Sequence, residues 1–467
     1  MQDITKTEEK NWLRQRLGRQ LSELTRLSFP IVLQRIGIMT MGVVDTMMVG
    51  HVNATELAYQ SAGDIPVTTM IVLALGLLSG VMILSSNACG ADRPRESGLI
   101  WKRGMIHAAG MGILSLLVCL YGEEILLLLG QTPDISRGGG EVIFVLGLGM
   151  PFLTMMLAST FFLESISRPL PSLIIMIAAN LVNVFLNWVL VFGHLGFDPM
   201  GAVGSAWATT MVRLFLCVAL VGYIIYMKES AYFGIRDKAD LSWKSWARQR
   251  QVGYAVGITN GAEHMGFAAL MVFAGWLGAA TLAATSITIK LFGLPFMIGI
   301  GIGGATAVRV GIALGRKDFR DLVLAGSCGL LLNVTIMLPL SILMWFHAET
   351  LARWFSSDAL LISLATPLIA LAGLMLLLDT AQAVMGNALR GRQDIWIPTL
   401  IYIFCYNVVM IPLCWYLAFP FGQGAEGLFI AIILVSILAA MLAGGRFYYL
   451  SWQDQKNAVT ANNASRQ

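Results

Sequence analysis

The sequence predicts an all-α membrane protein of twelve transmembrane helices, arranged as two pseudo-symmetric bundles of six. Three observations lead to this fold class. Hydrophobic residues make up 57% of the chain and charged residues only 12%, whereas a soluble domain carries about 25% charge. Twelve apolar runs are long enough to cross ~30 Å of hydrocarbon, and the second half of the chain repeats features of the first.

The twelve expected helices follow one another with short polar gaps between them. They are expected at 27–50, 57–82, 102–124, 139–162, 171–193, 202–227, 251–275, 282–306, 323–346, 361–387, 396–418 and 425–449. The net charge of +4 does not indicate a nucleic-acid partner, because the basic residues fall in the gaps and form no polar basic surface.

The basic residues predict the orientation. With the N-terminus inside, nearly all of them lie in inner segments, and the outer loops receive only Arg137 and Arg353. Positive residues remain on the cytoplasmic side of membrane proteins, so both termini are expected in the cytoplasm. Arg35, Arg213 and Lys290 are left within spans; for the two arginines, snorkelling or pairing within a bundle is expected.

The repeat defines the domains. At an offset of 225 residues, Gly50 matches Gly275 and Arg95 matches Arg320, and at 227 residues Trp188 matches Trp415. Units of six helices are parallel repeats, as in several transporters. We expect a cytoplasmic tail at 1–26, bundles at 27–227 and 251–450, a linker that acts as a hinge at 228–250, and a tail at 451–467.

The first tail supports two interpretations. Trp12, Leu13, Leu17, Leu21 and Leu24 recur at helical spacing with arginines between them, as in a basic helix on an anionic membrane surface; a solvated, disordered tail is the alternative. The six cysteines have no metal-ligand spacing and are interpreted as free thiols.

Polar residues that break the repeat are candidates for function. Asp45 lies in the first span, where a carboxylate is costly, although contact with headgroup water remains an alternative, because the helix end is about five residues or ~8 Å away. Asn180, Asn183 and Asn187 share one face of the fifth span, and Thr209 could join them. Their oxygens suit a proton or Na⁺ site; the alternative is that the amides only join helices.

The second half offers a different set. Glu263 is expected ~18 Å deep and Asp379 deeper toward the inner side. Lys290 is within plausible reach of Glu263, so a neutralising ion pair is an alternative role for both. Asp64 ranks below these groups, as either cavity-lining or interfacial. Glu164 and Arg168, four residues apart, are expected to form a local salt bridge.

No catalytic motif accompanies these groups. The chain has no nucleophile elbow, no HExxH and no dinucleotide fingerprint. It also has no P-loop, so direct use of ATP is not expected. The expected protein is therefore not an enzyme and has no cofactor, and an ion gradient remains as the energy source.

The motifs resemble those of the multidrug and toxic compound extrusion (MATE) family, most closely its NorM-type branch. The resemblance covers Leu27 to about Tyr449. Its residues are Met41-Gly42-Val43-Val44-Asp45-Thr46-Met47-Met48-Val49-Gly50, Asn183-Val184-Phe185-Leu186-Asn187-Trp188, Arg309-Val310-Gly311 with Leu314-Gly315, Leu389-Arg390-Gly391, and Gly201 to Thr209.

The resemblance implies an antiporter that exports cationic or amphipathic drugs in exchange for H⁺ or Na⁺. It places a cation site, possible for Na⁺, at Asp45, Asn183 and Asn187, and acidic groups of the second bundle at Glu263 and Asp379. The sequence departs from many relatives at Thr285-Ser286, where a His-Gln pair is usual, and at Lys290, where an uncharged residue is usual. An ammonium near Glu263 would compete with Na⁺ there.

The expected mechanism is alternating access by two rocking bundles. Asp45 takes up H⁺ or Na⁺ from outside and a bound organic cation is expelled. We expect a monomer in the bacterial inner membrane, in contact with lipid. Two other functions stay open: a flippase for a lipid-linked precursor, although such proteins have a basic central cavity, and a membrane scaffold or receptor that transports nothing.

Overall fold

The computed structural model describes residues 6–355 and 358–464, and their regular structure is helical throughout. In chain order the helices are α1 (Lys6–Gly50), α2 (Ala54–Gly90), α3 (Pro94–Cys119), α4 (Gly122–Leu128), α5 (Pro133–Leu148), α6 (Met150–Ser165), α7 (Leu170–Leu190), α8 (Gly201–Tyr226), α9 (Ala247–Trp276), α10 (Ala279–Gly315), α11 (Phe319–Phe346), α12 (Ala348–Arg353), α13 (Ala359–Gly391), α14 (Trp396–Ile403), the π-helical η1 (Phe404–Met410), α15 (Ile411–Ala418) and α16 (Gly424–Ala464).

These helices account for the twelve expected spans. Within the described residues, nine helices are long and apolar enough to cross a membrane, and the bent pairs α3–α4 and α5–α6 add two more. The seventh expected span is α9, whose 30 residues rise about 45 Å. It is less apolar because it carries Arg248, Arg250 and Glu263. The fold class predicted from the sequence is therefore confirmed.

Two spans depart from a regular α-helix at identifiable places. The 46° bend between α5 and α6 lies at Gly149, where Pro151 at the start of α6 offers no N–H to the preceding turn. The last-but-one span is continuous, but its middle, η1, has π-helical hydrogen bonding. π-Helical turns are frequent at functional sites, and η1 carries Tyr406, which is almost wholly buried.

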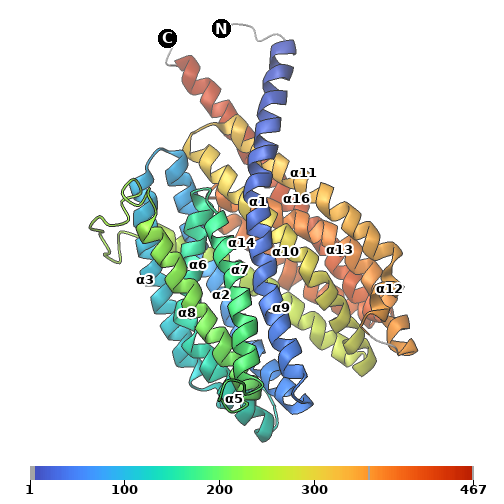
Figure 1. Ribbon diagram of the computed structural model, residues 1–467. Coiled ribbons are helices and arrows are strands. Elements are labelled where there is room, and N and C mark those ends of the chain that lie inside the picture. Colours follow the sequence, from blue (N-terminus) through green and yellow to red (C-terminus); the bar gives the residue numbers. More distant parts are fainter. Residues whose placement is uncertain (1–5, 356–357, 465–467) are drawn as a thin grey trace. The chain divides into compact units, whose positions relative to one another are not determined.

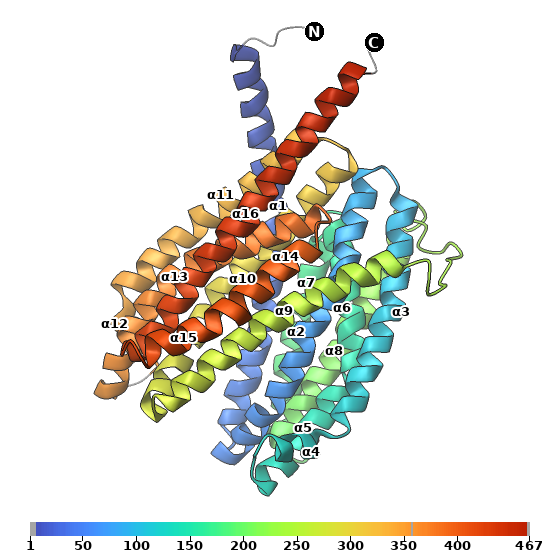
Figure 2. The same ribbon diagram turned by 180° about the vertical axis from the view of Figure 1, so that it is seen from behind.

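The chain forms two compact units. The N-terminal unit comprises Leu33–Cys89 and Arg93–Gly257, and the C-terminal unit comprises Met1–Val32, Gly90–Asp92 and Ile258–Gln467. In the N-terminal unit α8 packs against α5, α6 and α7. In the C-terminal unit α13 packs against α10, α11 and α16, which lie side by side in both views (Figures 1 and 2). Unlike the expected bundles, the units divide within α1 and α9.

The beginning of α1 belongs to the C-terminal unit. Residues 15–26 continue the first span as one helix and pack on α10 and α11, with Gln20 and Leu24 each 1% exposed. This differs from both the surface helix and the disordered tail expected for this segment. The side chains of Trp12 and Leu13, on which part of that expectation depended, lie outside the described part of the chain.

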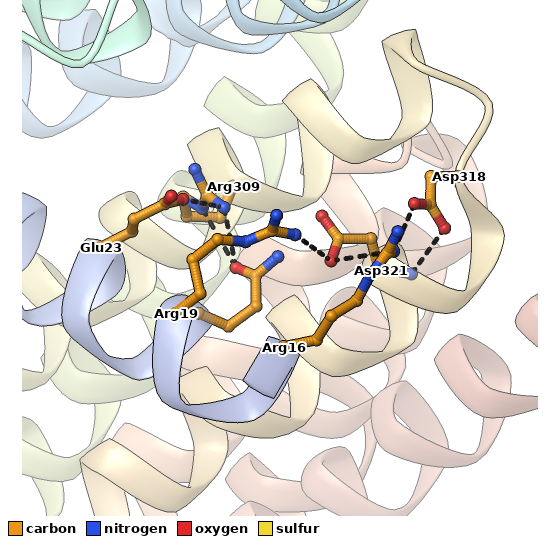
Figure 3. A network of polar contacts seen from close by, with 7 residues as sticks. Arg16, Arg19, Glu23, Arg309, Asp318 and Asp321 are labelled. Atoms are coloured by element: carbon orange, nitrogen blue, oxygen red, sulfur yellow. Dashed lines mark hydrogen bonds and ion pairs between the residues drawn. The ribbon is translucent and has the colours of Figure 1, made fainter. Parts of the chain in front are cut away.

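An ionic cluster holds this part of α1 in place (Figure 3). Arg16 Nη1 donates to Asp318 at 2.5 Å, and Arg19 Nη2 donates to Asp321 at 3.3 Å. Burial alone would raise the pKa of Asp318, but the hydrogen bonds from Arg16 and from the backbone N–H of Asp321 outweigh burial and lower this pKa below its ordinary value. Asp318 is therefore ionised at neutral pH, and its bond to Arg16 is charge-assisted.

Arg309 is a buried cation of this cluster. Its guanidinium donates to Gln20 Oε1 from Nε at 3.2 Å and from Nη2 at 2.9 Å, and it forms an ion pair with Glu23. We expect Arg309→Met to lower the free energy of unfolding by about 1–2 kcal/mol, because the buried amide of Gln20 loses its partner. The apparent Tm in detergent should fall by a few degrees.

The matched control is Arg316→Met, one residue beyond the end of α10, where the side chain is exposed. Its apparent Tm should stay at the wild-type value. Equal stability of both variants would show that the cluster does not hold α1.

The linker is fixed to the N-terminal unit. Lys102 Nζ donates to the carbonyl oxygens of Gly234 at 2.9 Å and Asp237 at 2.6 Å, and Arg103 Nε donates to that of Asp240 at 3.0 Å. Arg168 donates to Glu229 at 2.7 Å, and this hydrogen bond lowers the pKa of Glu229. Residues 228–250 are thus bonded along their length to elements of one unit, and their role as a hinge between the bundles stays a prediction.

Candidate functional site

In the N-terminal unit, three helices bring polar groups around Asp45. This residue lies on α1 between the buried positions Met41 and Val49, one turn away on either side, and is itself 6% exposed. Asn187 of α7 donates from Nδ2 to Asp45 Oδ1 at 2.7 Å, and Thr209 of α8 donates from Oγ1 to Oδ2 at 2.7 Å. Both carboxylate oxygens are therefore held by uncharged donors, and the contact with headgroup water considered from the sequence is not the environment of Asp45.

The asparagines of α7 differ in their roles. Asn187 and Asn183 are 0% exposed, and the Asn187 amide also bonds the Asn183 carbonyl oxygen at 3.0 Å. Within the described residues, Oδ1 of Asn183 and Oδ1 of Asn187 have no hydrogen-bond partner, and the Asn183 side chain lies beside Asp45 and acts on it as a weak hydrogen-bonding group. Asn180 lies two turns away and donates to the Met176 carbonyl oxygen at 2.9 Å, so it is not bonded to the carboxylate.

The unpartnered oxygens suggest what this arrangement can hold. Buried polar atoms without partners are rare and often mark an ion or water site. Together with the two Asp45 oxygens, Oδ1 of Asn183 and Oδ1 of Asn187 offer the hard oxygen ligands that a small cation prefers. A proton on Asp45 is the other way to neutralise the buried carboxylate. In this structure the Asn187 amide turns Nδ2 toward Asp45, so its oxygen could join a cation only after the amide rotates.

Arg35 and Glu164 form a second charged pair in this unit. Arg35 Nη2 lies 3.1 Å from Glu164 Oε1, and the carboxylate is fully buried. The predicted Glu164–Arg168 salt bridge is wrong, because Arg168 bonds Glu229 instead. Gln34 also donates to Thr160 at 3.3 Å. These contacts fix α1 to α6 on the N-terminal side of Asp45.

In the C-terminal unit, Asp379 of α13 is the centre of a buried hydrogen-bond network. It is 1% exposed, and its Oδ1 accepts from the Tyr406 hydroxyl at 2.8 Å and from Ser436 Oγ at 3.0 Å. Gln382 donates from Nε2 to the same oxygen at 3.3 Å and to the Tyr406 hydroxyl at 2.9 Å. Oε1 of Gln382 is buried and has no partner in the described structure.

Glu263 of α9 is half-buried near this network. It interacts electrostatically with Asp379 and, with opposite sign, with Arg390. The Arg390 guanidinium lies 5.9 Å from the Tyr402 ring centroid, and Tyr402 stacks on Tyr406. The Lys290 side chain is exposed, and among the described residues no ion pair joins it to Glu263. The basic residue that faces Glu263 is therefore Arg390, which the sequence placed in an inner loop.

Four residues of these sites were not singled out from the sequence: Gln382, Tyr406, Ser436 and Arg390. Gln382 could have been found, because it follows Asp379 by three residues and so shares its helix face. Ser436 and Tyr406 come from separate helices and give no local signal. Within the described residues no three His, Cys, Asp or Glu side chains gather as a metal cluster, so any Na⁺ here would depend largely on amide and hydroxyl oxygens.

Comparison with known proteins is consistent with these observations. The MatE family model matches residues 30–189 and 255–416. A protein of Caulobacter vibrioides named "Probable multidrug resistance protein NorM" is 36% identical over 442 residues, covering 94% of each chain. A Brucella suis protein of the same name is 30% identical, covering 89% of this chain and 90% of its own. The crystal structure of the eukaryotic MATE transporter AtDTX14 superposes with a TM-score of 0.85 at 19% identity, covering 95% of this chain and 99% of its own.

Proposed function

The chain belongs to the MatE family of membrane transporters, in its NorM-type branch, and from this we propose that it exchanges H⁺ or Na⁺ for cationic or amphipathic organic compounds. As a member of this family it is a secondary transporter and not an enzyme. Multidrug efflux is the activity named for its relatives. The coupling ion and the substrate class are the parts that we add.

The observation that carries the proposal is the buried Asp45 carboxylate with its uncharged donors. A carboxylate at this depth is costly unless a cation or proton neutralises it. Asn187 and Thr209 orient Asp45 without neutralising it, so the site retains a full negative charge for an incoming cation. Asp379 and Glu263 form a second acidic site, complete within the C-terminal unit.

The coupling is thermodynamic. A cation that binds one conformation of the transporter more tightly than the other shifts the balance between them by that difference in affinity. We propose that cation uptake at Asp45 favours the state that releases the organic compound outward. Return of the cation to the cytoplasm then restores the state that binds the compound from inside.

We further propose that the protein acts as a monomer in a bacterial inner membrane with both termini in the cytoplasm. The Asp45 and Asp379 carboxylates have hydrogen-bond partners within the same chain and require none from a second copy, which is compatible with a monomer. The asymmetry of basic residues supports the orientation. The sequence relatives reported above come from bacteria, which supports the location.

The test uses purified protein in proteoliposomes, with tetraphenylphosphonium as the organic cation. An imposed Na⁺ gradient and an imposed pH gradient are compared at equal magnitude, and uptake against the concentration gradient of the probe is measured. We expect one of the two gradients to drive accumulation and the probe to cause a counterflow of that ion. Accumulation with neither gradient present would contradict the proposal, as would binding without transport, which is the result expected of a scaffold or receptor.

A further inference from the structure

Arg213 of α8 is a buried cation without an ion pair. It is 8% exposed, and among the described residues no carboxylate lies within ion-pair distance of it. It therefore neither snorkels nor forms a salt bridge, the two possibilities considered from the sequence. A charged side chain inside a membrane span is costly and usually functional.

A neutral acceptor holds the guanidinium. Arg213 Nη1 donates to the carbonyl oxygen of Leu146 at 3.0 Å. Leu146 lies in the last turn of α5, just before the bend at Gly149, and carbonyls at a helix C-terminus carry partial negative charge. Thr210 makes a parallel bond to the carbonyl oxygen of Val145 at 2.8 Å. The end of α5 thus fixes the position of Arg213 through an uncharged acceptor. The guanidinium keeps its full positive charge, because no carboxylate contacts it.

This charge lies close to Asp45. Thr209 and Arg213 are four residues apart and share one face of α8, and Thr209 is the residue whose hydroxyl bonds Asp45 at 2.7 Å. The backbone positions of Arg213 and of Thr209, a bonded partner of the carboxylate, are thus about one helical turn apart along α8. The two charges interact electrostatically across that interval.

Asp64 of α2 supplies a second carboxylate that acts on both Arg213 and Asp45. Its neighbour Gly63 packs on α5, where an added Cβ would lie 2.8 Å from Val142 Cγ1. Val142 is one turn before Leu146, the acceptor of Arg213. The titratable groups whose charges act on Arg213 are Asp64, Asp45 and the thiol of Cys119. Asp64 in turn interacts with Asp45 and Arg213.

The charge of this compartment can be counted. With both carboxylates ionised and the Cys119 thiol protonated, two carboxylates and one guanidinium give a net charge of −1 before any cation or proton binds. In a medium of low dielectric constant, charge neutrality is strongly favoured. One monovalent cation or one proton completes it, whereas two would be required if Arg213 were absent.

We infer that Arg213 is a built-in counter-charge that limits the N-terminal unit to one coupling cation per transport cycle. Arg213 is therefore a specificity-determining residue for the stoichiometry of exchange, acting through the charge it places beside Asp45 and Asp64. The inference rests on the proposed function, because it requires that cation uptake at Asp45 drives transport.

The test is a set of charge variants in proteoliposomes. The number of cations exchanged per tetraphenylphosphonium is obtained from the cation gradient at which the probe flux reverses, with the membrane potential clamped at zero, because exchange of one monovalent cation for one monovalent probe moves no net charge. Arg213→Gln should raise this number from one to two, and Asp64→Asn should lower it to zero, so that a cation gradient no longer drives exchange. The double variant Asp64→Asn/Arg213→Gln has the wild-type net charge and should return to the wild-type stoichiometry. Arg213→Lys keeps the charge and should also match the wild type.

A purely structural arginine gives a different result. Transport would then be slower in Arg213→Gln and in the double variant, with no change in the cation gradient at which the flux reverses, and this outcome overturns the inference. If Arg213→Gln does not fold, the comparison of Asp64→Asn with the double variant decides: a stoichiometry that is unaltered in Asp64→Asn, or not restored by the second substitution, overturns it. Absence of cation-driven exchange by the wild type would instead remove the proposed function.

Discussion

Asp45→Asn should reduce cation-driven transport of an organic cation by at least about tenfold while the protein still folds and inserts. The substitution keeps the size of the side chain and an oxygen that can accept from Asn187 or Thr209, but it removes the negative charge. Interactions with a charged group are worth about 1.5–3 kcal/mol, and 1.4 kcal/mol corresponds to tenfold in affinity. Uptake into proteoliposomes under the driving gradient measures the effect.

The matched control is Asp198→Asn, which makes the same chemical change at an exposed position between α7 and α8. It should transport at the wild-type rate. Size-exclusion elution and apparent Tm establish that both variants are folded. Wild-type transport by Asp45→Asn would remove Asp45 from the mechanism, even if the protein remains a transporter.

Gly98→Ala should destabilise the N-terminal unit by about 3 kcal/mol and loosen the linker. Gly98 is in the second turn of α3, and a Cβ added there would overlap the backbone oxygen of Phe233 in the linker. A backbone atom cannot move aside as the end of a side chain can. The expected loss of free energy of unfolding is therefore at the upper end of the range of about 1–3 kcal/mol typical of overpacked sites. We expect a lower apparent Tm and faster tryptic cleavage after Arg236 and Lys238.

Gly110→Ala, in the same helix, provides the comparison. An added Cβ at Gly110 meets no atom within 4 Å, and alanine favours the helix more than glycine does. Its apparent Tm should equal or slightly exceed that of the wild type, and its cleavage pattern should not change. Equal behaviour of the two alanine variants would show that the linker is not held against α3.

The fold could be predicted to a large extent from the sequence, because its signals are local. Each span is a continuous apolar run, and the periodicity of α7 placed Asn183 and Asn187 on one buried face. The expectation that Thr209 would join Asp45 also agrees with the contacts in the structure. The role of these residues in cation binding stays a prediction, which the Asp45 variant tests.

Contacts between distant parts of the chain could not be predicted. Spacing of four residues favoured a Glu164–Arg168 pair, yet the partner of Glu164 is Arg35 on another helix. The arginines of the first tail indicated a lipid surface, whereas the acidic partners of Arg16 and Arg19 are Asp318 and Asp321, some 300 residues later. Helical periodicity gives the face on which a charge lies, but the packing of other helices decides what covers that face.

Depth estimates had a similar limit. Lys290 was placed within reach of Glu263 from helix rise alone, but its side chain is exposed, and Arg390 is the cation that interacts with Glu263. The linker was interpreted as a hinge because it is polar and long. Polarity does not show whether donors such as Lys102 and Arg103 will meet its carbonyl groups.

The interior placement of the cysteines has a practical consequence for labelling. All six are free, five of them are buried, and Cys89 is only partly exposed. Enclosed thiols are shielded from maleimide reagents, so a cysteine introduced at an exposed position should react first in the otherwise native chain. Fluorescent or spin probes can therefore be attached in a lipid bilayer without first replacing the natural cysteines.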